Sequence, residues 1–239
     1  MEAPMKKSVL VTGADAGLGL SLVKRFLQGG FVVFAGVYRS SVSLNALTEE
    51  YGNSLVFIPL DVADMDSVCE AAQQVAKQTN TLDIAINNAA IHLNDTKGAL
   101  EQLDLGNEGL QLTVNVNAFG PLRVVQQFLT LLENGSQKLV INISSEAGSI
   151  ADCRRENQFA YCMSKAALNM QSKILQNYLG PRGFKVLAVH PGWMRTNMGG
   201  PNAAISPDES AEGIFKLALR EWNADDPIYM DFKGNPMNW

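Results

Sequence analysis

The chain has 239 residues, a length that fits one large α/β domain and can bury a sizeable core. Hydrophobic residues make up 46% and charged residues 18%, which is ordinary for a soluble globular enzyme and excludes a disordered chain. The net charge is −5 and basic residues adjoin one another only in pairs, so the sequence predicts no nucleic-acid partner.

The sequence indicates neither a membrane segment nor a metal site. The longest apolar run, Phe31 to Tyr38, is too short to cross a bilayer, and no signal-peptide pattern precedes the first expected strand. The cysteines form no C-x-x-C motif and the histidines are isolated; these residues are Cys69, Cys153, Cys162, His92 and His190. We therefore expect no structural metal, no disulfide framework and no membrane, and a reducing cytoplasm as the location.

Seven short β-rich runs alternate with longer helical patterns. The runs are Ser8–Thr12, Phe31–Val37, Ser54–Leu60, Leu82–Asn87, Lys138–Ser144, Phe184–His190 and Ile228–Phe232. Helical periodicity follows the first and third runs, over Leu18–Gln28 and Met65–Gln78, and Asp64 is the expected N-cap of the second helix. The runs are nearly continuous in apolar residues, as strands buried on both faces are. The sequence therefore predicts one doubly wound α/β domain over residues 1–239, with a seven-stranded parallel sheet and helices on both faces.

One long irregular stretch interrupts this alternation. Pro191 to Pro207 is rich in glycine, proline and asparagine, and a loop of that length in a compact domain is often functional. We expect residues 191–206 to form a lid over a binding site.

A glycine-rich turn follows the first expected strand directly, in the sequence VTGADAGLGL. Gly13 permits a tight turn, Gly17 lets the backbone approach a phosphate, and Gly19 lets the next helix pack on the strand. The first amides of that helix can bind an anion. A purely structural turn is the alternative, but the place of the glycines right after the first strand favours a dinucleotide site.

Tyr161 and Lys165 stand one helical turn apart in AYCMSKAALNM. The spacing by itself is weak evidence of catalysis, because chance supplies roughly a quarter of one such pair in this composition. An apolar stripe on the same helix is predicted to pack on the sheet or on a partner. Its members are Met163, Ala167, Met170 and Ile174.

Five motifs, in this order, resemble those of the short-chain dehydrogenase/reductase family. T-G-x-x-x-G-x-G begins at Thr12, and the later motifs are NNAA at 87–90, ISS at 143–145, YCMSK at 161–165 and PGWMRT at 191–196. The similarity extends from Thr12 to the end of the sequence. It implies a Rossmann-type domain that binds a nicotinamide cofactor.

The resemblance implies a proton-transfer group built on three of these residues. Tyr161 is implied to be the general acid/base. Since a free tyrosine with a pKa of ~10 is a poor base near neutrality, a cation has to stabilise its phenolate. Lys165 is implied to supply that cation and to hold the nicotinamide ribose. Ser145 is implied to hydrogen-bond the substrate oxygen, with Ser144 as the alternative.

The fourth catalytic position is an asparagine in the helix before the fifth strand. TVNVNAFGPL offers Asn115 and Asn117, and the family's spacing to the following glycine favours Asn117, which is implied to hold a water that relays protons. Fifteen residues separate Ser145 from Tyr161, a little more than is usual in the family. This predicts a loop insertion, within ADCRRENQF, beside the substrate pocket.

The resemblance also implies the cofactor contacts. Besides Tyr161 and Lys165, these are Gly13, Asp15, Gly17, Leu18, Gly19, Arg39, Asp61, Val62, Asn88, Ala89, Ala90, Pro191, Gly192 and Thr196. The end of the second strand, AGVYRS, has no carboxylate and carries Arg39, which favours NADP(H), because an arginine accommodates a 2′-phosphate. The nearby Asp15 leaves NAD(H) possible.

The last third of the sequence resembles a subgroup of that family, the C-factor/sniffer-like carbonyl reductases, in HPGWMRTNMGGPNA, SPDESAEGI and DFKGNPMNW. This implies an NADP(H)-preferring oxidoreductase that transfers a hydride between the nicotinamide and a small carbonyl or alcohol. The candidate substrate contacts are Ser145, Tyr161, Trp193 and Met194. For Trp193 and Met194 the alternative is ordinary loop packing.

A nucleotide-binding sensor or signalling protein of the same fold is the alternative function. Relatives commonly pair through the helices after the fourth and fifth strands, which implies a homodimer or homotetramer.

Overall fold

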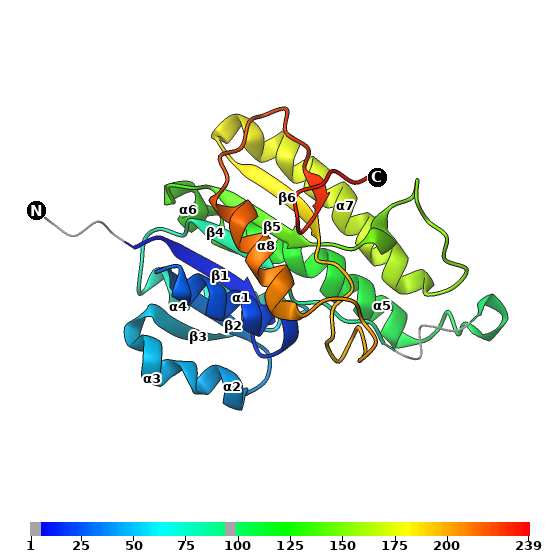
Figure 1. Cartoon of the computed structure of the whole chain (residues 1–239), viewed down its shortest axis with the longest axis horizontal. Coiled ribbons are helices and arrows are strands. Elements are labelled where there is room, and N and C mark those ends of the chain that lie inside the picture. The colour runs from blue at the N-terminus through cyan, green and yellow to red at the C-terminus, as the bar shows by residue number, and fades with distance from the viewer. Residues whose placement is uncertain (1–5, 94–98) are drawn as a thin grey trace, which may run out of the picture.

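The computed structural model describes residues 6–93 and 99–239, and its strands form one parallel sheet (Figure 1). The strand order is β3-β2-β1-β4-β5-β6-β7. The bounds are β1 Ser8–Thr12, β2 Val32–Val37, β3 Leu55–Pro59, β4 Ile84–Asn87, β5 Leu139–Ile143, β6 Lys185–His190 and β7 Tyr229–Asp231. Each strand lies inside its predicted run, so the predicted seven-stranded parallel sheet is confirmed.

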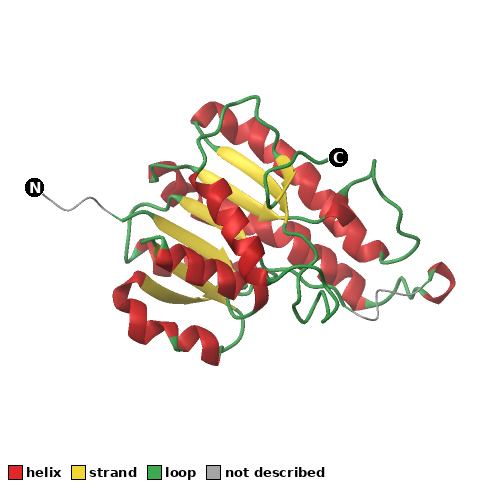
Figure 2. Ribbon diagram, in the orientation of Figure 1, coloured by secondary structure: helices red, strands yellow, loops and turns green. Residues whose placement is uncertain are grey.

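Helices cover both faces of this sheet (Figure 2). Their bounds are α1 Gly17–Gln28, α2 Val42–Asn45, α3 Leu47–Tyr51, α4 Met65–Ala76, α5 Glu108–Val114, α6 Gly120–Asn134, α7 Phe159–Leu179 and α8 Pro207–Leu219. Asp64 caps α4 as predicted, because its Oδ1 accepts a hydrogen bond from Asp66 N at 2.9 Å.

Two separate apolar cores lie between the sheet and its helices. Val9 and Val11 of β1 belong to the core under α1 and α8, whereas Leu10 belongs to the core under α4 and α6. Successive side chains of a strand point to opposite faces, and here both faces are buried. This is the physical reason why the strands are nearly continuous in apolar residues.

The position of the site follows from the strand order. β1 and β4 are neighbours in the sheet, although β2 and β3 lie between them in the sequence. Ligands of doubly wound sheets bind beyond the carboxyl ends of the strands, at the point where the order reverses. The turns after β1 and β4 meet there: Thr12 Oγ1 accepts hydrogen bonds from Asn88 N and Ala89 N, both at 3.0 Å.

The apolar stripe predicted on α7 does not pack on the sheet. Met163, Met170 and Ile174 are each more than half exposed, and the buried side of α7 carries polar residues near its start and leucines near its end. The buried residues include Ser164, Leu168, Ser172, Leu175 and Leu179. The first alternative, that the stripe packs on the sheet, is therefore wrong, and packing on a partner stays a prediction. The helix meets the sheet through small polar side chains where it lies close to the strands.

Candidate active site

A cleft of about 1350 Å³ opens at the carboxyl ends of the strands. It brings together the glycine turn, the ends of β2 to β6 and the loop after β6. The predicted site residues that line it are Gly13, Asp15, Gly17, Leu18, Arg39, Asp61, Val62, Asn88, Ala89, Ala90, Ser145, Tyr161, Lys165, Pro191, Gly192, Trp193, Met194 and Thr196. Gly19 and Asn117 do not line it; both lie behind its wall.

The glycine turn lets α1 start directly at the cleft. A Cβ atom on Gly19 would lie 2.0 Å from the Gly13 carbonyl oxygen, so only glycine allows this approach of helix and strand. Ala16 occupies the N-cap position and has no polar side chain to bind the first amides of α1. The helix N-terminus therefore presents uncapped backbone donors and the positive end of the helix dipole, a combination that suits a phosphate. The Thr196 side chain, from the loop after β6, lies beside Gly17 at the start of α1.

Asn88 holds this turn in place. Its Nδ2 donates hydrogen bonds to the carbonyl oxygens of Thr12, at 2.9 Å, and of Gly13, at 3.1 Å. These bonds use both amide hydrogens, so the side chain supports the turn and contributes to the cleft mainly through its shape. Thr12, which sequence reasoning did not place in the site, holds the turn after β4 through its hydroxyl group.

The end of the cleft beside β2 has acidic and basic residues close together. Tyr38 N donates to Asp15 Oδ1 at 3.5 Å, and the Arg39 guanidinium lies 5.5 Å from the Tyr38 ring centroid. Asp61 Oδ1 accepts a hydrogen bond from Ala63 N at 2.9 Å, which shapes the turn after β3. Arg39 is therefore placed at the end of β2, where the ribose of a dinucleotide binds in folds of this type.

Ser145 and Tyr161 meet in the deep part of the cleft. Burial has the largest effect on Tyr161 and raises its pKa above the ordinary value, whereas a hydrogen bond with Ser145 lowers that pKa by a smaller amount. Tyr161 is therefore protonated near neutrality and can donate a proton to a ligand. Ser144, the alternative serine, is committed elsewhere, because its hydroxyl group donates to Asn169 Oδ1 at 2.6 Å.

Lys165 brings a buried amine to the same place. Its side chain is 2% exposed and its Nζ donates a hydrogen bond to the Ile143 carbonyl oxygen at 2.8 Å. Nζ lies 5.8 Å from the Tyr161 ring centroid. Burial lowers the pKa of Lys165 to about 8, so most of the amine remains charged at neutral pH.

Asn117 lies behind Tyr161 and Lys165, in a π-helical turn between α5 and α6. Its Oδ1 accepts from Ile91 N at 2.8 Å, and its Nδ2 donates to Ile91 O at 2.9 Å and to Ser164 Oγ at 3.0 Å. Asn115 points elsewhere and donates to the Ala63 carbonyl oxygen at 3.2 Å. Of the two asparagines, Asn117 is the one that joins the loop after β4 to the helix carrying Tyr161.

The mouth of the cleft has four polar side chains that sequence reasoning did not include in the site. Arg155 forms an ion pair with Glu146 and donates to Gln158 Oε1 at 2.6 Å. His190 Nδ1 accepts a hydrogen bond from Glu146 N at 3.2 Å. Arg155 and Gln158, which belong to the predicted insertion, line the cleft. No residue pattern marked these side chains, because they come together only through the ends of three different elements.

The loop after β6 is closed at its base by one short parallel bridge between Met194 and Ile205, and its residues 191–199 line the cleft. Its base is held by Arg195 N, which donates to Ile205 O at 3.0 Å, and by Ile205 N, which donates to Trp193 O at 3.2 Å. Trp193 Nε1 also donates to Gly199 O at 2.8 Å, while the ring remains 58% exposed. The indole N–H is thus used within the loop, and the exposed ring is left as an apolar wall beside Met194.

The part of the chain that the structure describes contains no helix with the length and apolar character needed to cross a bilayer. Within residues 6–93 and 99–239 there is also no group of three histidine, cysteine or acidic side chains placed to hold a metal ion.

Residues 7–205 match the family model described as short chain dehydrogenase. Among curated proteins, the chain is 33% identical to C-signal of Myxococcus xanthus over 67% of this chain and 95% of that protein. It is 30% identical to an uncharacterized oxidoreductase of Schizosaccharomyces pombe over 88% of this chain and 89% of the relative.

Solved structures with the same fold include two carbonyl reductases. The NADPH-bound carbonyl reductase from chicken fatty liver has a TM-score of 0.88 and 32% identity, and the match covers 98% of this chain and 99% of that one. Carbonyl reductase Sniffer of Drosophila melanogaster has a TM-score of 0.89 and 25% identity, covering 98% and 100%.

Proposed function

The chain belongs to the short-chain dehydrogenase family, and we propose that it is a reductase that transfers a hydride from NADP(H) to a small carbonyl compound. The observation that carries this proposal is the meeting of Ser145, Tyr161 and Lys165 in one cleft with an uncapped helix N-terminus. The residues fit a dinucleotide, because Gly13, Gly17 and Leu18 line the cleft where α1 begins and no side chain caps that end of the helix.

A bound nicotinamide supplies the hydride, and the side chains of this chain handle the proton. Ser145 is proposed to orient the carbonyl oxygen, and Tyr161 to protonate it. Because burial raises the pKa of Tyr161, the proton is present at neutral pH for the reductive direction. The charged amine of Lys165 then stabilises the phenolate that remains. The same groups run the oxidation of an alcohol when Tyr161 begins as the base.

Asn117 is proposed to help return a proton to Tyr161 after each turnover. Its hydrogen bonds to Ile91 and Ser164 keep the π-helical turn against the helix of Tyr161. A water held there would join Lys165 to solvent and restore the tyrosine proton after each turnover. This role was implied by the family resemblance, and the position of Asn117 supports it.

The preference for NADP(H) is proposed from Arg39 at the end of β2 and from the cofactors of similar proteins. The chicken and Pseudomonas aeruginosa carbonyl reductases are described with NADPH and with NADP, respectively. Asp15 lies next to this position and opposes a 2′-phosphate, which keeps NAD(H) possible. Fluorescence titration with NADPH and NADH tests the preference directly, using Arg39→Glu. NADPH affinity falls in this variant if Arg39 binds the phosphate, and unchanged affinity rejects that role.

The experiment for the main proposal compares the wild type with Tyr161→Phe on a panel of aldehydes and ketones. Loss of NADPH consumption in Tyr161→Phe, with cofactor affinity retained, is expected. Equal rates in the two proteins contradict the role of Tyr161. The alternative, a nucleotide-binding signalling protein, gains support from the similarity to C-signal. It predicts cofactor binding without turnover of any carbonyl by the wild type.

We also propose that the chain forms a homodimer or homotetramer in the cytoplasm. The exposed stripe on α7 is accompanied by Leu112 of α5 and Leu122 at the start of α6, which are both exposed. Apolar patches of this kind often mark protein interfaces. Sedimentation of the wild type against Met170→Asp tests this: a monomeric wild type rejects the proposal.

A further inference from the structure

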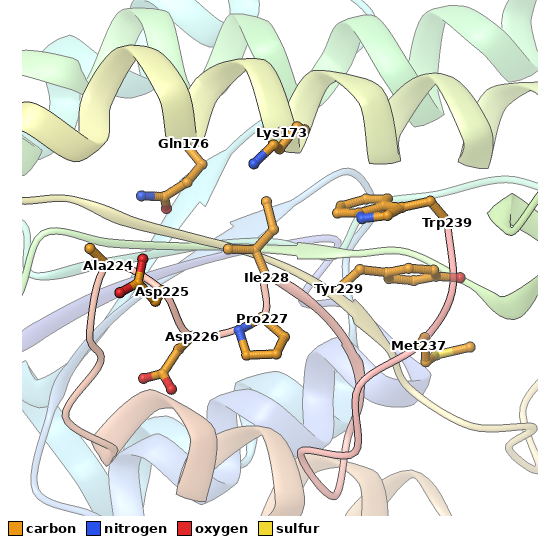
Figure 3. A pocket seen from close by; sticks show the side chains of 10 residues that line it. All are labelled: Lys173, Gln176, Ala224, Asp225, Asp226, Pro227, Ile228, Tyr229, Met237 and Trp239. Atoms are coloured by element: carbon orange, nitrogen blue, oxygen red, sulfur yellow. The ribbon is translucent and has the colours of Figure 1, made fainter.

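The last residues of the sequence contact the segment that carries Ser145. Tyr229 Oη donates a hydrogen bond to the Ser145 carbonyl oxygen at 2.7 Å, in a fully buried position. Trp239 stacks on the Tyr229 ring, with centroids 5.1 Å apart and planes at 28°. Figure 3 shows the two rings one over the other, at the edge of a cavity of about 340 Å³ beside α7.

The last residues of the sequence also hold the far end of the loop that begins at Ser145. The Trp239 carbonyl oxygen accepts a hydrogen bond from Ala151 N at 2.8 Å. Asn238 Nδ2 donates to Asp152 Oδ2 at 3.2 Å, and Met237 N donates to Tyr229 O at 3.0 Å, which ties this segment to β7. Residues 145–152 are therefore held at their beginning by Tyr229 and at their end by Trp239. We call Tyr229 and Trp239 the aromatic clamp.

Besides the Tyr161 side chain, helix α7 contacts this loop through Asn169, at positions on either side of Ser145. Asn169 accepts from the Ser144 hydroxyl group and donates to the Gly148 carbonyl oxygen at 3.1 Å. The Ser145 carbonyl oxygen itself is bound by Gly148 N, at 3.0 Å, and by Tyr229. The Tyr229 bond is thus the one long-range hydrogen bond that the described residues make to the Ser145 carbonyl oxygen. Losing it leaves the local turn and the bond from Ser144 N to Val189 O of β6 in place, but it removes the one long-range hydrogen bond to the Ser145 carbonyl oxygen itself.

The geometry points to Tyr229 and Trp239 as positioning residues that fix the Ser145 hydroxyl group relative to the Tyr161 hydroxyl group. This inference rests on the proposed function, in which both hydroxyl groups bind one substrate oxygen. Reacting groups have to be held within about 0.5 Å of their productive geometry, and a displacement of about 1 Å can cost about 100-fold in rate. Burial also raises the pKa of Tyr229 to about 12, so its hydroxyl group remains a donor throughout the working pH range.

The first test is steady-state carbonyl reduction by Tyr229→Phe, with Tyr178→Phe as the matched control. Tyr178 is a tyrosine on α7 that is 67% exposed, so the control removes the same atom from a surface site. We expect Tyr229→Phe to lower kcat about tenfold, with KM changed less than about twofold and NADPH affinity unchanged. A kcat equal to that of Tyr178→Phe overturns the inference.

A double-mutant cycle separates positioning from general damage. If Tyr229 acts through Ser145, then Tyr229→Phe in a Ser145→Ala background lowers the residual rate no further than Ser145→Ala alone. An equal loss in both backgrounds shows that Tyr229 acts on the fold as a whole, and it overturns the inference.

The second test does not depend on turnover. Hydrogen exchange of the Ala151 amide is expected to rise at least about tenfold in Trp239→Ala and to stay near the wild-type value in Trp239→Phe, which keeps a stacked ring. Equal exchange in both variants contradicts the clamp. Failure of the wild type to reduce any carbonyl overturns the proposed function instead, and the exchange measurement then decides the clamp by itself.

Discussion

The Tyr161 phenol ring is stacked on the His92 imidazole ring, with centroids 4.3 Å apart and planes at 19°. His92 belongs to the loop after β4, which is also held by Asn117 through Ile91. The stack therefore joins the proposed proton donor to the turn beside the proposed nicotinamide position, and it covers one face of the tyrosine.

Replacing His92 by alanine is expected to let the Tyr161 ring move more freely, because the stacked imidazole ring is removed. Stacked aromatic pairs contribute about 0.5–1.5 kcal/mol beyond their buried area, which corresponds to a loss of about two- to thirteenfold in kcat/KM for His92→Ala. His92→Phe keeps a flat ring and is expected to retain most of the activity. The measurement is carbonyl reduction at saturating NADPH, and equal activity of the two variants contradicts a role for the stack.

Carbonyl reduction is expected to decline above about pH 8. Burial lowers the pKa of Lys165 to about 8, so the amine loses its positive charge as the pH rises through that value. The neutral amine no longer stabilises the phenolate that forms when Tyr161 gives up its proton. Rates measured from about pH 6 to 10 check this, with NADPH affinity determined in the same buffers to separate binding from chemistry. A rate that stays level to about pH 9.5 contradicts it.

Replacing Lys165 by methionine is expected to abolish reduction but to stabilise the fold. The lowered pKa corresponds to about 3 kcal/mol at pH 7, because burial disfavours the charged amine. The unfolded chain binds the additional proton between about pH 8 and 10.5, so wild-type stability rises across that range and the advantage of Lys165→Met shrinks. Urea unfolding at about pH 7 and 10 measures both differences. A less stable variant at neutral pH contradicts the assignment of the cost to burial.

A methyl group on Gly19 is expected to destroy the proposed cofactor site. Its Cβ would lie 2.0 Å from the Gly13 carbonyl oxygen, so Gly19→Ala has to push α1 away from the turn, at about 1–3 kcal/mol, and NADPH binding is lost. Gly30→Ala is the control. Gly30 has φ +82° and no described atom within 4 Å of the position that a Cβ would take, so that change costs about 1–2 kcal/mol of backbone strain but leaves NADPH affinity unchanged. Isothermal titration and thermal melting of both variants distinguish the two effects.

Much of the fold could be predicted from local patterns. Continuous apolar runs such as Ser8–Thr12 predict strands buried on both faces, and alternation with helices limits such strands to a parallel sheet. The glycine turn and the Asp64 cap could be located for the same reason, since each acts within a few residues of its own position.

Local patterns along single elements were enough to predict the seven-stranded sheet and the glycine turn, whereas Tyr161 and Lys165 were paired only through the family resemblance, because their spacing by itself is weak evidence. Only the packing of the elements established that Asn117 and not Asn115 contacts the helix of Tyr161, that the α7 stripe is exposed, and that Tyr229 binds the Ser145 carbonyl oxygen from 84 residues away. Those contacts join side chains from different elements, and no periodic pattern records which of them the sheet brings together.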